Sequence, residues 1–173
     1  MKTWNIDTTH SEIAFKAKHL MISTIRGVFN KFEGKIIANN DTFNDGHITF
    51  SVEVNSLETR NPDRNGHLLN PDFFYVEKFP TLSFSSTSIK RVADKLEITG
   101  DLTIKGVTKQ IEVEAIVKGT NKGMEGEKVT AFDITAKINR QDFGLVWNVT
   151  LETGGVLIGE IVQIEAFIEV KEA

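Results

Sequence analysis

Histidines are the first side chains to consider for chemistry, because imidazole binds metals and exchanges a proton near neutral pH. The chain contains four, at His10, His19, His47 and His67. Metal sites usually include two ligands spaced two to four residues apart, which places both on one face of a strand or helix. Here the closest pair, His10 and His19, is separated by a whole strand's length of sequence. The spacing therefore predicts no metal centre.

His19 is the histidine best placed for a role in binding. It continues the alternation of Ile13, Phe15 and Ala17, so its imidazole is expected to point into the protein. A buried polar group without a partner costs about 1–3 kcal/mol. Two interpretations follow: a core histidine that bonds to a backbone carbonyl or buried water, or a donor to a bound ligand. His47 lies on the polar face of its strand and is expected to be solvated.

Arg64 and His67 are three residues apart, so they share one face of a helical turn. With the apolar Phe74 nearby, they could hold the polar head of a ligand whose tail lies inside the protein. The planar guanidinium group of arginine binds a carboxylate or a diphosphate well, because it donates two parallel hydrogen bonds. The alternative is that Arg64 pairs with Asp63 or Asp72 and only locks the loop.

Sequence patterns of enzymes are missing. There is no Gly-x-Ser-x-Gly, phosphate-binding loop or Gly-x-Gly-x-x-Gly, and no cysteine for a thiolate or disulfide. His10 and Ser11 are neighbours, which on a strand point to opposite faces, and Asp142 near Arg140 is interpreted as a turn ion pair. We therefore expect neither an enzyme nor a cofactor. The alternative is an isomerase or hydrolase that acts on a buried apolar substrate with His19 as base.

The elements that position these residues belong to one expected domain, residues 1–173. The net charge of −4 argues against nucleic acid, which requires a basic surface. No stretch reaches the roughly 18 apolar residues of a membrane-spanning helix. The N-terminal residues lack the apolar core of a signal peptide, so a cytoplasmic location is expected, or a periplasmic one if the chain is a processed form.

Alternation of apolar and polar residues with period two runs through most of the chain. It predicts antiparallel strands with one solvent-exposed face. The clearest segments are residues 13–19, 48–54, 96–104, 111–117, 132–138 and 162–170. With hairpin turns at Ala93–Lys95 and Lys105–Gly106, we count eight or so strands. That number closes into an all-β barrel wide enough for one small ligand, although a two-sheet sandwich gives the same pattern.

Two segments interrupt the alternation. Residues 61–74 begin with Asn61-Pro62, a helix N-cap followed by proline, and contain a second such start at Asn70-Pro71. They predict one or two short helical turns across a barrel mouth. Residues 119–128 hold three glycines and no apolar run, and predict a mobile surface loop.

Phenylalanine is unusually frequent, with 12 residues against one tyrosine. Because phenylalanine has no polar group, this composition indicates a dry interior, either an ordinary filled core or the wall of a cavity. The residues proposed to line a ligand-binding cavity are Phe15, Phe29, Phe32, Phe50, Phe74 and Phe84, with His19, Arg64 and His67 as polar contacts. If the rings simply fill the barrel, the protein has a structural or stress-response role instead.

Several short motifs, each present once, follow one another along the chain. They are Trp4-x-Ile6-Asp7-x-x-His10-Ser11, Gly27-x-Phe29-x-x-Phe32-x-Gly34, Thr59 to Arg64 with His67-Leu68, Asp72-Phe73-Phe74, Gly100 to Thr108, and Arg140-x-x-Phe143-Gly144. Together they resemble the YceI-like family of bacterial lipid-binding proteins over nearly the whole chain.

The resemblance implies a lipocalin-like eight-stranded antiparallel barrel with an apolar tunnel. It further implies that the tunnel holds a long-chain amphiphile, such as a polyisoprenoid, an isoprenoid quinone or a fatty amide. We therefore expect a non-enzymatic protein that carries or sequesters a long isoprenoid or fatty-acyl ligand. Many members are periplasmic and many form a homodimer. Two departures stand out: the missing signal peptide, and Asn65-Gly66 where the family often has an acidic pair. The second is expected to make this loop less charged and more flexible.

Overall fold

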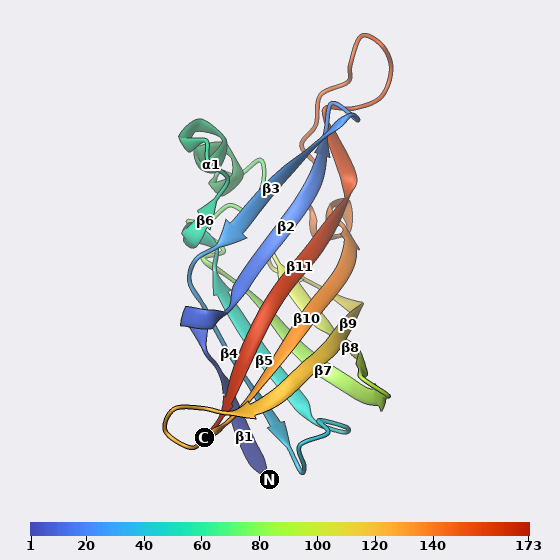
Figure 1. Ribbon diagram of the computed structural model, residues 1–173. Helices are drawn as coiled ribbons and strands as arrows, with labels where there is room; N and C mark the ends of the chain where they lie inside the picture. Colours follow the sequence, from blue (N-terminus) through green and yellow to red (C-terminus); the bar gives the residue numbers. More distant parts are fainter.

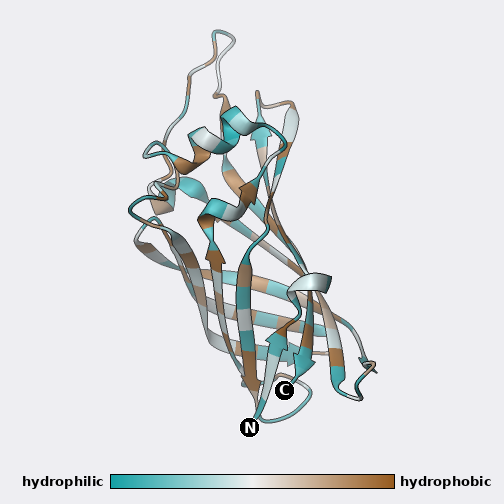
Figure 2. Ribbon diagram, turned by 90° about the vertical axis from the view of Figure 1, so that its left-hand side faces the viewer, coloured by the Kyte–Doolittle hydropathy of each residue, from teal (hydrophilic) through white to brown (hydrophobic).

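Alternating side chains build eleven strands, which Figure 2 shows as brown and teal bands along the ribbons. The computed structural model describes residues 1–173. The strands are β1 (Lys2–Ile6), β2 (Glu12–His19), β3 (Ser23–Phe29), β4 (Phe32–Ala38), β5 (His47–Glu53), β6 (Leu57–Glu58), β7 (Thr81–Val92), β8 (Lys95–Ile104), β9 (Val107–Lys122), β10 (Lys128–Asn139) and β11 (Ile158–Glu172). The helical elements are α1 (Pro62–Leu69) and the 3-10 turns η1 (Thr8–His10), η2 (Val54–Ser56) and η3 (Arg140–Phe143).

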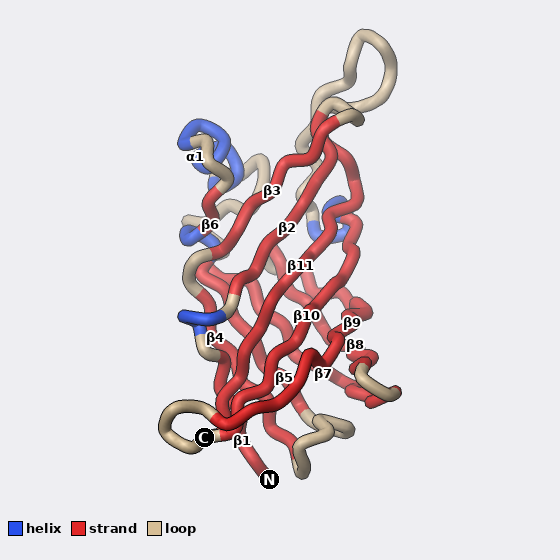
Figure 3. Tube along the Cα trace, viewed as in Figure 1, coloured by secondary structure: helices blue, strands red, loops and turns tan.

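The strands close into an antiparallel barrel of eight (Figures 1 and 3). Three of the eight barrel strands are interrupted, and each of these consists of two shorter strands. They are β1 with β2, joined by η1, then β3 with β4, and β5 with β6, joined by η2. Strand β11 closes the ring by pairing with β1 near its end and with β2 along the rest of its length. This closure confirms the predicted barrel and rules out the sandwich.

Turn chemistry behaves largely as the sequence predicts. Val92 pairs with Lys95 and Ile104 with Val107, so both expected hairpins are present with two-residue turns. The second turn places Gly106 at φ 75°, a left-handed conformation that glycine adopts without steric cost. The predicted loop at residues 119–128 is shorter than expected, because β9 and β10 stay paired as far as Lys122 and Lys128.

The predicted helical turns are present at one end of the barrel. Asn61 caps α1 by accepting a hydrogen bond from the Arg64 backbone N–H at 3.1 Å, and Pro62 occupies the first turn. The segment from Asn70 to Tyr75 then folds back through turns, in which Phe74 N–H donates to the Leu68 carbonyl at 2.9 Å. No helix of the structure has both the length and the apolar character needed to cross a membrane. We call the end of the barrel that carries α1 the mouth; it lies at the top of Figure 1.

Aromatic rings fill the opposite end, where both chain termini lie (Figure 1). Trp4 and Phe43 are almost completely buried there, and their ring centroids are 5.1 Å apart. Phe43 also meets Phe132 of β10 at 5.3 Å, which ties β1 and the β4–β5 connection to the far wall. This cluster packs between the strands and closes the end of the barrel away from the mouth.

Candidate ligand-binding cavity

A cavity of about 560 Å³ runs inside the barrel. Of the 42 residues that line it, 36 are hydrophobic, so the interior offers almost no hydrogen-bonding groups to a ligand. Five of its six polar lining residues come from the mouth end, and the sixth is Lys35 of β4. The five at the mouth are His19, Asp63, Arg64, His67 and Arg140. The cavity is therefore polar at one end and apolar along the rest of its length.

Glycines keep this interior open despite the many phenylalanines. Gly27 of β3 lies opposite Phe15 of β2, and a Cβ atom at Gly27 would come within 2.2 Å of the Phe15 ring. Gly100 of β8 lies diagonally across from Phe84 of β7, which pairs with Leu102, and a Cβ atom at Gly100 would come within 2.4 Å of the Phe84 ring. Because each ring occupies the space above a glycine of the next strand, it lies along the wall instead of crossing the barrel. Gly34 and Phe50 form a third such pair, at 2.8 Å.

The structure places eight of the nine proposed binding residues on the cavity. They are Phe15, His19, Phe29, Phe50, Arg64, His67, Phe74 and Phe84. The ninth, Phe32, does not line the cavity; its ring packs against Phe50 with centroids 6.0 Å apart. Phe32 begins β4 directly after the break between β3 and β4, and its partly buried side chain packs against the hydrophobic core.

Arg64 is held by Thr59 and by neither of the acids considered from the sequence. Its Nε donates to Thr59 Oγ1 at 2.9 Å, and its Nη2 donates to the Thr59 carbonyl. Asn65 completes this arrangement, because its side-chain oxygen accepts from Thr59 N–H at 2.9 Å. The segment expected to be more flexible is thus a capped helix whose residues are bonded to one another. Arg64 keeps its Nη1 donors for other partners at the cavity mouth.

His67 forms an aromatic and ionic junction beside Arg64. Its Nε2 lies 2.9 Å from Asp72 Oδ2, so the partner of Asp72 in this loop is His67, whereas the sequence suggested Arg64. Its ring packs edge-on against Phe73 and Trp147, with centroids 4.9 and 4.5 Å away. Trp147 comes from the segment between η3 and β11, and this contact joins that segment to α1 across the mouth.

His19 lies at the end of β2 and lines the cavity, as its place in the alternation predicts. Its Nδ1 is 3.5 Å from Ser23 Oγ, and it takes part in none of the ion pairs of the structure. A catalytic histidine is normally oriented by a carboxylate or carbonyl that fixes its tautomer. Here the ring is free to present a nitrogen to a ligand.

Arg140 corrects one interpretation made from the sequence. It forms no ion pair with Asp142; its buried guanidinium instead donates to four backbone carbonyls. Nε reaches the Gly159 carbonyl at 2.9 Å and Nη1 the Trp147 carbonyl at 3.0 Å, and the other two acceptors belong to Leu145 and Ile158. Burial lowers the pKa of Arg140. The side chain anchors both ends of the segment that connects η3 to β11.

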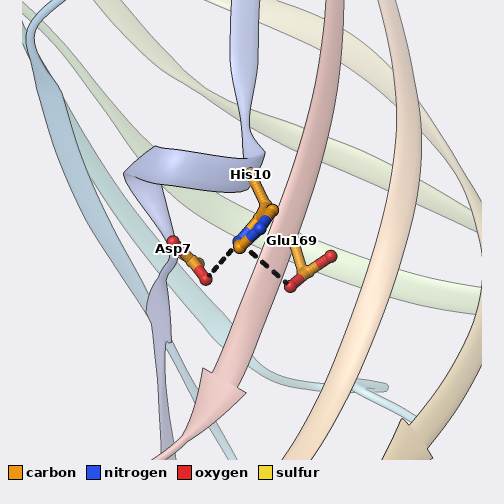
Figure 4. Close-up of side chains that lie close together, drawn as sticks. All are labelled: Asp7, His10 and Glu169. Carbon is orange, nitrogen blue, oxygen red and sulfur yellow. Dashed lines mark hydrogen bonds and ion pairs between the residues drawn. The ribbon is translucent and has the colours of Figure 1, made fainter. Parts of the chain in front are cut away.

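A second cluster of polar groups lies on the outside of the barrel, where β1 turns into β2 (Figure 4). His10 Nδ1 is 2.9 Å from Asp7 Oδ2 and 3.9 Å from Glu169 Oε1. Lys171 Nζ lies 2.7 Å from the same oxygen of Asp7, so this carboxylate is already paired with a cation. The hydrogen bonds from Lys171 and His10 hold the pKa of Asp7 far below its usual value, and Asp7 raises the pKa of His10. We interpret the cluster as an ion-pair network across the seam between β1, β2 and β11.

Sequence reasoning missed Trp147, Arg140 and the three glycines. Trp147 lies in a segment without alternation, which gave no reason to place it at the mouth. The glycines carried a usable signal, because glycine weakens a strand unless something packs closely over it. Identifying which ring covers each glycine requires the cross-strand register.

A closed antiparallel barrel around an apolar cavity, with polar groups at one mouth, places the protein in the class of small β-barrels whose interior is wide enough for one small ligand. The YceI-like domain matches residues 4–170, and the chain belongs to the YceI-like family. A UPF0312 protein of Staphylococcus epidermidis is 36% identical over 170 residues, which are 98% of this chain and 97% of that protein.

Solved structures agree with this assignment. The crystal structure of the Campylobacter jejuni YceI protein has a TM-score of 0.77 and 28% identity, and the match covers 90% of each chain. A polyisoprenoid-binding domain from Saccharophagus degradans has a TM-score of 0.72 and covers 98% of each chain. Because the two sequences are only 13% identical, this likeness shows a shared fold alone.

Proposed function

We propose that the protein binds a long-chain amphiphile in its barrel and carries or sequesters it, with the chain in the cavity and the polar head at the mouth. The observation that supports this most is the distribution of polarity in the 560 Å³ cavity, apolar along its length and polar at one end. An isoprenoid or fatty-acyl chain with a polar head has the same distribution. The residues proposed to meet the head are His19, Arg64 and His67.

The size of the cavity supports a ligand of this class. If a methylene group occupies about 30 Å³, the liquid volume of one water molecule, the cavity accommodates roughly 19 such groups. At about 0.8 kcal/mol for each buried methylene, their transfer from water provides about 15 kcal/mol. Association and ordering cost about 4–15 kcal/mol. The phenylalanine rings that lie over glycines keep that cost low, because they need not move aside for the ligand. Micromolar binding, which requires −8.2 kcal/mol, lies within this range.

Relatives support the same ligand class. The Saccharophagus degradans structure is described as a polyisoprenoid-binding domain, and the present chain shares its fold. We extend that ligand class to this protein on the strength of the cavity. An isoprenoid quinone or a fatty amide satisfies the same geometry. The homodimer and the cytoplasmic location expected from the sequence stay predictions.

Enzymatic activity receives less support from the site. A hydrolase or isomerase with His19 as base requires a group to orient the ring and a second group to receive or return the proton. Ser23 Oγ, at 3.5 Å, is the neighbour of His19 Nδ1, and no carboxylate pairs with this ring. We therefore propose a binding protein.

Organic extraction and mass spectrometry of the purified protein, together with native mass spectrometry, test the proposal. We expect a stoichiometric long-chain lipid, either copurified or taken up when quinones and isoprenoids are added. Phe15→Asp places a charge on the cavity wall and is expected to abolish lipid retention. Phe167→Asp is the matched control, because Phe167 is half-exposed on the outer face of β11 and does not line the cavity.

Circular dichroism establishes that both variants fold. A folded Phe15→Asp protein that retains lipid as well as the wild type contradicts the proposed site. An empty wild-type protein that takes up neither quinones nor isoprenoids contradicts the proposed function.

A further inference from the structure

Two neighbouring segments at the mouth expose apolar side chains to solvent. The turn between β2 and β3 carries Leu20, Met21 and Ile22, which are 41%, 60% and 84% exposed. The segment between η3 and β11 carries Val146 and Val149, which are 60% and 45% exposed. We call these five side chains the apolar tip. Contiguous exposed apolar surface of this kind marks an interaction site in soluble proteins.

The apolar tip is built on backbone hydrogen bonds. Leu157 N–H donates to the Val149 carbonyl at 2.9 Å and Leu151 N–H to the Gly155 carbonyl at 3.0 Å, which makes a narrow arm of two antiparallel segments. Leu20 N–H donates to the Leu157 carbonyl at 2.9 Å and fastens the β2–β3 turn to the base of this arm. Figures 1 and 3 show the arm projecting beyond the rim of the barrel at the mouth.

The sequence around the tip is nearly free of charge. No Asp, Glu, Lys or Arg lies between Lys18 and Arg26 or between Asp142 and Glu152, and Glu152 itself lies in the turn at the outer end of the arm. The turns at the opposite end differ, because each contains charged residues. The β7–β8 turn has Asp94, and the β9–β10 turn has Glu125 and Glu127. The uncharged, apolar character therefore belongs to the two segments of the apolar tip, whereas other parts of the mouth carry Asp63, Arg64 and Lys105.

The tip is continuous with the cavity wall. His19 directly precedes Leu20 and lines the cavity, and Leu157 lines it from the base of the arm. A ligand that leaves through the mouth thus passes directly from the cavity wall to the apolar tip. If the mouth opens into water, the whole apolar chain of the ligand is exposed during transfer.

We propose that the apolar tip inserts into the surface of a phospholipid bilayer, so that the ligand passes between bilayer and cavity without crossing water. This inference rests on the proposed function. A stable contact between proteins buries about 800 Å² on each partner, whereas the tip offers five side chains divided between the β2–β3 turn and the segment at the base of the arm. A fluid bilayer adapts to that shape. Because the tip lacks charge, insertion depends on apolar burial and changes little with salt.

A site-specific dye tests insertion directly, because the protein has no cysteine. Ile22→Cys is labelled with a polarity-sensitive fluorophore, and Val92→Cys, 56% exposed at the end of β7 beside the turn at the opposite end, is the matched control. With phosphatidylcholine vesicles, we expect a blue shift and a rise in emission for the label at position 22 and no change at position 92. Equal responses at both positions, or none at position 22, overturn the proposal.

Charge substitutions test the consequence for transfer. Met21→Asp and Ile22→Asp should each reduce partition onto phosphatidylcholine vesicles about tenfold, since burial of one such side chain is worth at least that factor. They should slow uptake of a quinone from vesicles while leaving the amount bound from detergent micelles unchanged. Val92→Asp should alter neither measurement. Equal partition of the wild type, the tip variants and Val92→Asp overturns the proposal.

The two readouts separate this inference from the proposed function. Vesicle binding that depends on the tip, in a protein that takes up no lipid, supports insertion and refutes the carrier. Lipid uptake from micelles by a wild-type protein that does not bind vesicles supports the carrier and overturns insertion. A change at position 22 that follows protein concentration without vesicles assigns the tip to contact between copies of the chain and also overturns insertion.

Discussion

The substitution Gly27→Ala tests whether the glycines beneath the phenylalanine rings keep the cavity open. The added Cβ lies 2.2 Å from Phe15 Cζ and 2.7 and 2.8 Å from the two Cε atoms, far inside contact distance. The backbone of β3 is held between β2 and β6, so the flexible partner is the ring. We expect the Phe15 side chain to leave the wall and enter the cavity.

The expected effect on binding follows from volume. A displaced ring occupies about 150 Å³, the size of a cavity that holds benzene, which is roughly a quarter of the 560 Å³ available. At about 30 Å³ for each methylene group, this loss excludes about five groups. At about 0.8 kcal/mol each, a ligand that fills the wild-type cavity loses about 4 kcal/mol, or roughly 1,000-fold in affinity. A chain shorter by five carbons should lose nothing.

The assay is native mass spectrometry with a series of fatty amides of increasing chain length. In Gly27→Ala the longest well-retained chain should shorten by about five carbons. Adding Phe15→Leu to Gly27→Ala should restore the longer chains, because a smaller side chain needs less of the cavity. Gly66→Ala is the control, since a Cβ there meets nothing within 4 Å. A folded Gly27→Ala protein with the wild-type length profile would refute the argument.

Three further predictions address the polar groups. His19→Phe should shift selection toward ligands whose heads accept no hydrogen bond, as measured by competition between quinones and hydrocarbons of equal length; unchanged selection contradicts a ligand contact at His19. Arg140→Lys should lower the free energy of unfolding by about 3 kcal/mol, because a single ammonium group cannot reach all four carbonyls, and urea titration measures this. Asp7→Asn should destabilise the protein at pH 7 but progressively less below pH 3.8. The lowered pKa of Asp7 contributes stability above that unfolded-state value and loses it as the pH falls, so a difference independent of pH counts against the network.

The barrel could be predicted from the sequence because its signal is local. In each strand, period two separates residues such as Ile98 and Leu102, which are buried, from exposed neighbours such as Glu97 and Asp101. Closure could not be deduced from the alternation alone, since it depends on β11 pairing with both β1 and β2. The helical turns at the mouth were predicted from Asn61 and Pro62, whose effect on the backbone is also local.

The site was less predictable, because its geometry depends on contacts that are distant in sequence. Alternation placed Phe15 and His19 on the cavity side, whereas Phe32 lies just after the break between β3 and β4 and packs beside Phe50 without lining the cavity. Asp142 was expected to pair with Arg140 because the two are close in sequence. The acceptors that Arg140 uses extend to Gly159, and no local rule connects those positions.

The aromatic cluster of Trp4, Phe43 and Phe132 gives the barrel a blind end. A molecule of the class proposed here enters tail first and leaves head first through one opening, so two ligands cannot pass each other. The resident molecule must therefore depart before its successor arrives, and a second ligand cannot speed the release of the first. A carrier with this geometry cannot act as a channel between two membranes. The protein must reorient so that its single opening faces first one membrane and then the other.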